Sequence, residues 1–495
     1  MHLRAFSPPI ALLISLVVLA PSHTVANAQA TSLEIEELSP FETIDSAVDA
    51  GSFGPHVDLS SSGTAAGGGR GGSGVAASGR PPVPRVAQLR GASDAVAEAQ
   101  ASSGVAGDNS RVARLYLLSK NTYRARCLDG SPAGYYLRRG FGSGASNWIL
   151  ILEAGGWCFN AKSCANRAKG PLGSSKQWPP TSNVQYGGVG STDSAVNPAF
   201  HNWNLVLVKY CDGSSFTGGY GKLRANAETG RALYFRGHWN LQGTLQDLLT
   251  RHGLNVGKQM LVGGCSAGGV ATSIKCDQIS RWMANYNVTT KCFMDGGYFP
   301  DVVDEDGKWT MRQKVQQMAG VHDMGRTGFN AECKRAMKKT NETWKCFFPE
   351  YNLQFARSPM LIVNSLSDYK AISLTLAPRP KGTSDPLLRC LRSSYQSCTP
   401  AQVKLLQSFS TKISTSIGKL VKMRSVENEG IQAFTFSQSA HCVVGEEMWQ
   451  KVQSTAKAFS SVPPPSSSSP SSPPLATSGA NGAPLATSFV SWYRS

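Results

Sequence analysis

Residues 260–269, MLVGGCSAGG, decide the fold that we predict for this chain. An apolar run leads into Gly264-Cys265-Ser266-Ala267-Gly268, a G-x-S-x-G pattern, and a helical stretch follows at 271–285. Glycines on both sides of a serine allow a sharp turn from strand to helix that exposes the hydroxyl. The alternative is a serine that merely begins a helix among small neighbours. The strand before the pattern and the helix after it favour a nucleophilic serine.

Short apolar runs that end at glycine or at a polar residue recur along the chain, with helical stretches between them. This alternation is typical of an α/β fold with a mainly parallel sheet flanked by helices. Polar side chains then gather at the carboxyl ends of the strands, where ligands bind. The runs that we interpret as strands are 147–152, 205–208, 260–262, 293–294, 360–363 and 434–436.

A nucleophilic serine needs a base, and the sequence offers few histidines. In α/β-hydrolases an acid and then the histidine follow the serine along the chain. Only His322 and His441 lie after Ser266. His322 follows a helical stretch, whereas His441 follows an apparent strand near the end of the folded part. We therefore predict that His441 is the base.

The acid should lie between the serine and the histidine. Asp368 stands just beyond the run 360–363, where it could hold the imidazole in one tautomer and stabilise the imidazolium. Asp295, at the end of the run 293–294, is the alternative. We predict Asp368.

Acyl transfer also needs N–H donors for the negative oxygen that develops in the transition state. One donor should be the amide of Ala267, directly after the serine, and the others should come from a glycine-rich loop after an earlier strand. Gly156 and Trp157 fit this place, because they follow the run 147–152. The alternative is an ordinary turn capped by a core tryptophan.

Several features predict a secreted, disulfide-stabilised protein. Residues 1–28 have the charge, apolar run and small residues of a signal peptide, and the run is too short for stable membrane insertion. The twelve cysteines lie between 127 and 442 and lack metal-site spacing, so we predict disulfides and no metal. Asn287 and Asn341 begin glycosylation sequons, as in an extracellular or cell-wall glycoprotein.

Composition divides the rest of the chain into three parts. Residues 29–112 form a Gly/Ser/Ala-rich low-complexity lead-in that is too poor in apolar side chains to fold. Residues 113–460 are long enough for one large catalytic domain. Residues 461–495 form a Ser/Pro-rich tail, which we expect to be an extended spacer.

The formal net charge of +17 could favour several kinds of partner. Lysine and arginine are scattered, without a dense run or a nucleic-acid motif, so we do not expect nucleic acid as a partner. A polyanionic glycan is the more natural partner of an exported protein. A basic surface with no specific role is the alternative.

Longer motifs give the sequence a specific resemblance to the pectin acetylesterase family, which also includes the animal carboxylesterase Notum. The match runs from about residue 129 to residue 449 and is similar to the plant-type branch, although Ala154 stands where that branch usually has glycine. The motifs are DGSPAGYY (129–136), GGWC (155–158), NPAFHNWN (197–204), YCDGSSFTGG (210–219), LYFRG (233–237), GCSAGG (264–269), NSLSD (364–368) and AHC (440–442).

The resemblance implies an α/β-hydrolase-like fold, no metal or organic cofactor, and a triad of Ser266, His441 and Asp368. The expected function is that of a secreted serine carboxylesterase that hydrolyses acetyl esters of pectin, an acetylated polysaccharide of the cell wall, through an acyl-enzyme. One alternative is an acylesterase for another glycan or, like Notum, for a protein-bound acyl chain. A catalytically silent glycan-binding protein is another.

Two cysteines adjoin the predicted serine and base. Cys265 precedes Ser266, and Cys442 follows His441. If the serine and histidine are within hydrogen-bond reach, these cysteines lie close enough for a disulfide, which requires Cα atoms within about 7 Å. We predict this pair. The alternatives are that either cysteine pairs elsewhere, or that Cys265 is buried without a partner.

Overall fold

The protein is described by a computed structural model that covers residues 112–182, 186–219, 224–225, 232–376, 386–392, 397–424, 430–454 and 483–495. The predicted signal peptide (1–28), the lead-in up to residue 111 and most of the predicted tail lie outside these residues.

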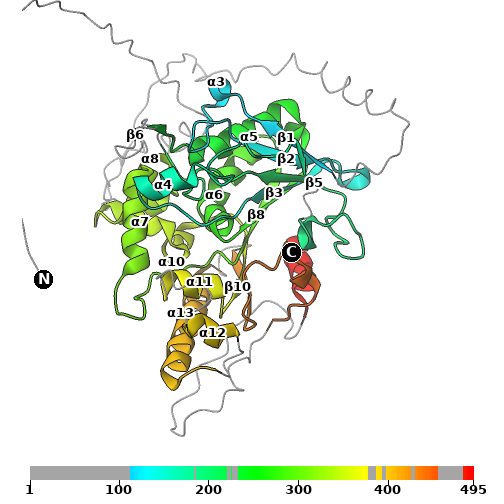
Figure 1. The fold of residues 1–495 in the computed structure, drawn as a ribbon. Helices are drawn as coiled ribbons and strands as arrows, with labels where there is room; N and C mark the ends of the chain where they lie inside the picture. The colour runs from blue at the N-terminus through cyan, green and yellow to red at the C-terminus, as the bar shows by residue number, and fades with distance from the viewer. Residues whose placement is uncertain are drawn as a thin grey trace, which may run out of the picture.

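A nine-stranded, mainly parallel sheet forms the centre of the described fold (Figure 1), in the order β11-β10-β9-β8-β3-β5-β2-β1-β4. Strands from β11 to β5 pair in parallel, as predicted. Strands β2, β1 and β4 add an antiparallel edge that lies outside the predicted runs. The strands are β1 Ala113–Leu117, β2 Gly134–Arg138, β3 Asn147–Leu152, β4 Thr181–Ser182, β5 Asn204–Val208, β8 Gln259–Cys265, β9 Thr289–Asp295, β10 Met360–Ser365 and β11 Ile431–Phe436, besides a short hairpin of β6 Arg224–Ala225 and β7 Ala232–Leu233.

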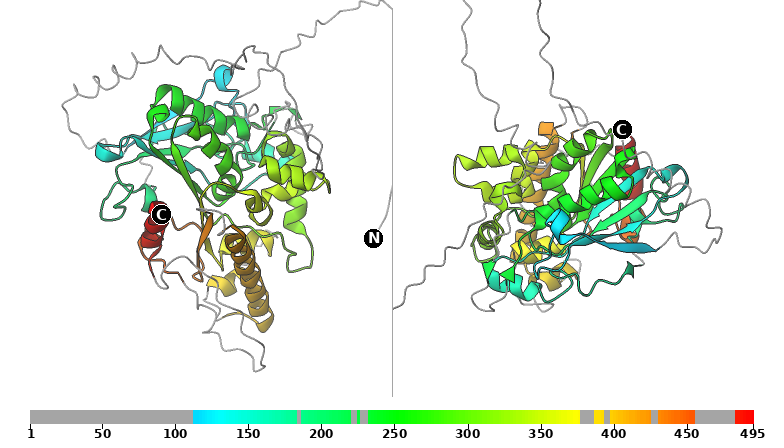
Figure 2. Two further views of the ribbon diagram at one scale, coloured as in Figure 1. Left: turned by 180° about the vertical axis from the view of Figure 1, so that it is seen from behind. Right: turned by 90° about the horizontal axis from the view of Figure 1, so that it is seen from above.

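Helices flank this sheet, as predicted, and α6 packs directly on β8 and β9. Figures 1 and 2 show α10 to α13, in yellow to orange-brown, grouped at the end of the molecule away from β1 and β2. The described helices are α3 Lys120–Tyr123, α4 Ala161–Arg167, α5 Gly237–Arg251, α6 Ala267–Ala284, α7 Thr310–Val321, α8 Met324–Thr327, α9 Ala331–Lys338, α10 Pro349–Asn352, α11 Tyr369–Thr375, α12 Pro386–Arg392, α13 Pro400–Arg424 and α14 Leu485–Arg494.

The central strands of the sheet are buried on both faces, and successive side chains of such a strand point to opposite sides and so enter different cores. In β3, Leu150 and Leu152 join the large core that α5 and α6 cover. Ile149 and Ile151 join a second core on the other face. A strand that is covered on both faces is apolar throughout, which is why β3 reads as a continuous apolar run.

The last part of the predicted spacer is instead folded. Residues 485–494 form helix α14, which buries Leu485, Phe489 and Trp492 in the second core. The expectation of an extended Ser/Pro-rich tail is therefore wrong for these residues. Apolar residues four and three positions apart lie on one face of a helix, and burying them favours a packed helix over an extended chain.

Six disulfides pair all twelve cysteines. The prediction of a disulfide-stabilised fold is therefore confirmed. Within the described ranges, no helix has both the length and the apolar character needed to cross a lipid bilayer.

Candidate active site

Ser266 occupies a sharp turn between β8 and α6. Its φ of 55° and ψ of −121° lie in a region that residues other than glycine rarely adopt, so the turn is strained. The amide of Ser266 donates to the carbonyl oxygen of Asp295, at 2.9 Å. The G-x-S-x-G pattern thus forms the predicted connection from strand to helix.

The glycines of the pattern are needed because three backbones meet here. A Cβ atom at Gly264 would lie 2.6 Å from the backbone of Gly268 and from the carbonyl oxygen of Leu152. A Cβ atom at Gly268 would lie 1.9 Å from that same oxygen. Any side chain at either position would separate α6 from β3 and move the turn.

The other two predicted residues contact each other. Asp368 follows β10 and caps α11, where its Oδ1 accepts from the amides of Lys370 (2.8 Å) and Ala371 (3.1 Å). Its Oδ2 lies 2.8 Å from Nδ1 of His441. An ionised carboxylate can only accept, so Nδ1 carries the proton and Nε2 is left with a free lone pair. This is the tautomer that a general base requires.

The predicted disulfide between Cys265 and Cys442 is present, with 5.5 Å between the two Cα atoms. It joins the residue before Ser266 to the residue after His441. The bond therefore fixes the segment that carries the histidine to the end of β8, directly before the serine. Side chains of Phe299 and Tyr369 pack edge-on around the imidazole, with ring centroids 6.4 and 5.9 Å from it.

Asp295, the alternative acid, makes different contacts. Its buried carboxylate accepts from the amides of Val443 (2.7 Å) and Val444 (2.8 Å). These two residues directly follow Cys442 along the chain. Burial raises the pKa of Asp295 to about 7, although both amides and the nearby His441 favour the ionised form. Asp295 therefore holds the segment that follows His441, whereas Asp368 contacts the imidazole itself.

The predicted oxyanion loop lies against the serine turn. The hydroxyl of Tyr210 donates to the carbonyl oxygen of Gly156 (2.8 Å) and accepts from the amide of Ser215 (2.9 Å). The indole of Trp157 donates to Oγ of Ser215 (2.7 Å), which donates to the carbonyl oxygen of Ala267 (2.7 Å). Among the described residues, the amides of Gly156 and Trp157 meet no acceptor. Tyr210 and Ser215 are outside the predicted site, and they link the two sets of donors.

Glu153 precedes this loop and is held firmly despite the neighbouring Ala154. One carboxylate oxygen accepts from the ammonium group of Lys209, and the other accepts from the amide of Tyr210 at 2.7 Å. Despite the departure from the plant-type pattern at Ala154, Glu153 is therefore held by one hydrogen bond at each carboxylate oxygen.

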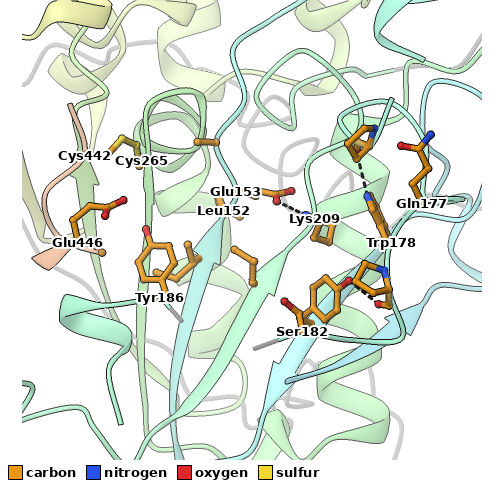
Figure 3. Close-up of a pocket in the computed structure, with 17 residues that line it drawn as sticks. Leu152, Glu153, Gln177, Trp178, Ser182, Tyr186, Lys209, Cys265, Cys442 and Glu446 are labelled. Atoms are coloured by element: carbon orange, nitrogen blue, oxygen red, sulfur yellow. Dashed lines mark hydrogen bonds and ion pairs between the residues drawn. A yellow bond between two sulfur atoms is a disulfide. The ribbon is translucent and has the colours of Figure 1, made fainter. Parts of the chain in front are cut away.

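A cavity of about 650 Å³ lies beside the disulfide between Cys265 and Cys442 (Figure 3). Both cysteines line it, together with residues from β2, β3 and β5, but Ser266 and His441 do not. The cavity therefore adjoins the candidate active site without containing its polar groups.

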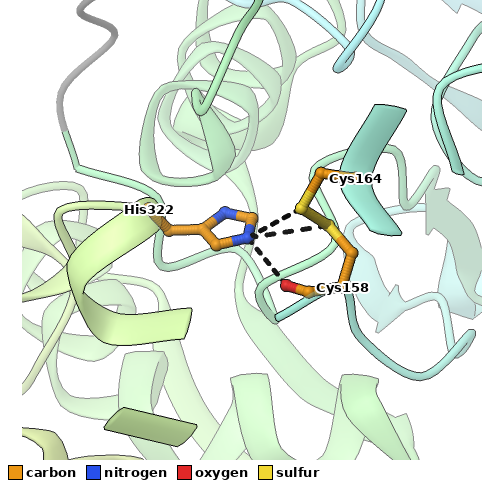
Figure 4. A group of neighbouring side chains, drawn as sticks. All are labelled: Cys158, Cys164 and His322. Atoms are coloured by element: carbon orange, nitrogen blue, oxygen red, sulfur yellow. Dashed lines mark hydrogen bonds between the residues drawn. A yellow bond between two sulfur atoms is a disulfide. The ribbon is translucent and has the colours of Figure 1, made fainter. Parts of the chain in front are cut away.

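His322, the histidine that we did not choose as base, lies beside Cys158, the residue that follows the predicted oxyanion loop (Figure 4). It is fully buried, and Nε2 donates to the carbonyl oxygen of Cys158 at 3.0 Å. Burial lowers its pKa to about 4, so it is neutral near pH 7. Cys158 and Cys164 lie close enough to His322 for a metal site, but they form a disulfide, and disulfide sulfurs are not the thiolates that metals bind.

The fold is that of an α/β-hydrolase-like protein. The crystal structure of the Wnt deacylase Notum from Drosophila aligns with a TM-score of 0.56 at 23% identity and covers 69% of this chain and 89% of that one. Such identity establishes the fold alone.

Sequence comparison identifies the family. A family model for pectinacetylesterase matches residues 106–462, and the chain therefore belongs to this family of carboxylic ester hydrolases. Pectin acetylesterase 5 of Arabidopsis thaliana is 36% identical over 318 residues (64% of this chain, 70% of the relative). Pectin acetylesterase 4 of the same plant is 35% identical over 349 residues (70% and 81%). Human palmitoleoyl-protein carboxylesterase NOTUM is 30% identical over 271 residues (52% and 51%).

Replacing Asp295 by asparagine should change how stability depends on pH. The folded state holds the Asp295 proton more tightly than the unfolded chain, whose carboxyl has the ordinary pKa of 3.8. Its contribution to stability is therefore complete below pH 3.8 and is lost as the pH rises to about 7. We expect the melting temperature of the wild type to fall across this range relative to that of Asp295→Asn. The exposed control Asp193→Asn should follow the wild type, and parallel curves for all three proteins would contradict the assignment.

Replacing Tyr210 by phenylalanine should impair turnover more than binding. The change removes both hydrogen bonds that join the Gly156 carbonyl to Ser215, so the loop loses its fixed position. We expect kcat to fall about tenfold, less than the loss of an oxyanion donor itself, with KM nearly unchanged. Tyr298→Phe is a matched control, because it removes a buried hydroxyl bonded to Ser416 at 2.6 Å. Equal kcat losses in both variants would show a general effect of destabilisation.

Proposed function

We propose that this protein is a secreted serine esterase that removes acetyl groups from pectin, with Ser266 as nucleophile, His441 as base and Asp368 as the acid that orients it. The observation that carries the proposal is the 2.8 Å contact between His441 and Asp368. A disulfide fixes the histidine's segment to Cys265, the last residue of β8 and the one directly before Ser266. Family membership supports the same reaction class.

The proposed reaction has two halves. Nε2 of His441 takes the proton of Ser266 Oγ while that oxygen attacks the acetyl carbonyl, and Asp368 stabilises the imidazolium. The ester C–O bond then breaks, and His441 gives the proton to the departing sugar oxygen, which leaves as a hydroxyl group. Water, activated by the same histidine, attacks the acetyl-enzyme, and acetate and free serine are released.

The negative oxygen of each tetrahedral intermediate needs donors that are already in place. The Ala267 amide lies at the N-terminus of α6, where the helix dipole favours negative charge. We propose the amides of Gly156 and Trp157 as the further donors. The hydrogen bonds through Tyr210 and Ser215 fix the position of their loop relative to Ala267. Donors of this kind are worth roughly 3–4 kcal/mol each.

The substrate and the compartment are inferred from the relatives and from the chain's chemistry. Relatives from Arabidopsis thaliana carry the name pectin acetylesterase, and a net charge of +17 favours a polyanion. Six disulfides persist in oxidising surroundings such as the cell exterior. Asn287 and Asn341 are exposed, as glycosylated asparagines must be. We therefore place the enzyme outside the cell, in or near the wall.

Removing the triad should abolish activity without unfolding the protein. We expect Ser266→Ala and His441→Ala to lower kcat by about 10⁴-fold or more, and Asp368→Asn to lower it by about 10³–10⁴-fold through the wrong tautomer. Hydrolysis of 4-nitrophenyl acetate measures the loss, and circular dichroism measures folding. The control Ser280→Ala, on helix α6 but distant along the chain from Ser266, should keep normal activity. Near-normal turnover by a folded His441→Ala variant would refute the assignment.

Pectin should be preferred over a neutral acetylated polymer. We expect faster acetate release from acetylated pectin than from acetylated xylan, and the advantage should shrink between about 0.05 and about 0.5 M NaCl as the charges are screened. Equal, salt-independent rates on the two polymers would favour a broader acylesterase. Faster hydrolysis of a long-chain acyl ester than of an acetyl ester would favour a Notum-like activity.

A further inference from the structure

The cavity beside the disulfide is built from mixed aromatic and polar walls. Lys209 runs between two rings, with its ammonium group 5.4 Å from the centroid of Trp178 and 5.9 Å from that of Tyr136. Tyr186 and Glu446 lie on the opposite side, and the pair of Glu153 and Lys209 lies between the two walls (Figure 3). Aromatic faces suit the C–H surfaces of a sugar ring, and polar groups suit its hydroxyls.

The ion pair in the middle of the cavity can bind hydroxyl groups without being broken. Lys209 gives one ammonium proton to Glu153, which leaves two more for a ligand. Glu153 accepts from Lys209 and from the Tyr210 amide, and its oxygens keep further lone pairs. Both side chains are partly exposed, 14% for Lys209 and 21% for Glu153, so a ligand can reach them. The pair therefore offers a donor and an acceptor to a neutral, polyhydroxylated molecule.

The charges in the cavity discriminate between neutral and acidic sugars. Among the described residues that line it, the charged side chains are Glu153, Glu446 and Lys209. Lys209 already neutralises Glu153, so one negative charge, on Glu446, is in excess. A free uronate carboxylate would be repelled here, whereas its methyl ester would not.

We propose that this cavity is a subsite for an uncharged sugar unit of the polysaccharide, of the methyl-esterified uronate type. The proposal rests on the proposed function, because it places this unit beside the one that carries the acetyl ester. Cys265, directly before Ser266, and Cys442, directly after His441, both line the cavity, which therefore lies next to the proposed nucleophile and base. The negative charge of Glu446 would thus favour methyl-esterified units over free uronates in the cavity, while the basic surface attracts the acidic polymer as a whole.

Binding of non-acetylated oligosaccharides tests the subsite without requiring catalysis. Isothermal titration calorimetry would compare fully methyl-esterified trigalacturonate with the free acid on the complete mature protein. We expect the wild type to bind the ester about tenfold more tightly, which is the effect of one nearby like charge at moderate screening. Glu446→Gln should remove most of this preference by tightening binding of the free acid. The exposed acid control Asp193→Asn should preserve the preference.

A second variant tests the space rather than the charge. Ser182 lines the cavity, and Ser182→Trp should weaken binding of the ester about tenfold or more by filling it. Ser194→Trp, at an exposed position outside the cavity, should bind normally. Equal affinity of the wild type for both oligosaccharides would overturn the proposal, and so would normal binding of the ester by Ser182→Trp.

Hydrolysis of 4-nitrophenyl acetate by the wild type separates this inference from the proposed function, because that substrate contains no sugar. Hydrolysis without any preference for the esterified oligosaccharide would leave the esterase standing and refute the subsite. A clear preference in a protein that does not hydrolyse the ester would support the sugar site and refute the esterase.

Discussion

The close approach of three backbones at Ser266 is the constraint on which the rest of the site depends. Strand β8 ends beside β3, and α6 begins so close to them that Gly264 and Gly268 have no room for a side chain. This crowding forces Ser266 into its strained turn and holds the Ala267 amide at the start of a helix. Because the turn is rigid, the remaining parts of the site need only be fixed relative to it.

Several separate connections fix those parts. The disulfide from Cys265 reaches the residue after His441, and Asp295 binds the two amides that follow. On the other side, Ser215 and Tyr210 bind the predicted oxyanion loop to the first turn of α6. Each connection begins on a strand of the parallel sheet or in the loop directly after one, so the geometry is set before a substrate arrives. Fixed donors need little reorganisation during reaction, which is how electrostatic stabilisation of an oxyanion becomes effective.

The parallel half of the sheet and the contact between Asp368 and His441 could be predicted from sequence, because both depend on local signals. Strands buried on both faces are continuously apolar, and chain order limits the choice of acid and base. The antiparallel strands β1 (ARLYL) and β2 (GYYLR) gave no such signal, because both are short and mix polar with apolar residues. Helix α14 was missed because a Ser/Pro-rich segment precedes it and its burial depends on a distant core. The role of Asp295 depends on a backbone nearly 150 positions later, which no local pattern encodes.

Electrostatics acts on two length scales in this enzyme. The net charge of +17 attracts an acidic polymer from a distance, but salt limits that attraction to about 10 Å at 0.1 M. Inside the cavity the nearest charges decide, and there the ammonium group of Lys209 is already paired with Glu153 while Glu446 stays unmatched. If the cavity is the proposed subsite, a polymer that carries both free and esterified carboxyl groups would satisfy both conditions, since its free acids would respond to the surface and its esters would fit the cavity. The pattern of esterification along the polymer, and not its total charge, would then determine which acetyl groups reach Ser266.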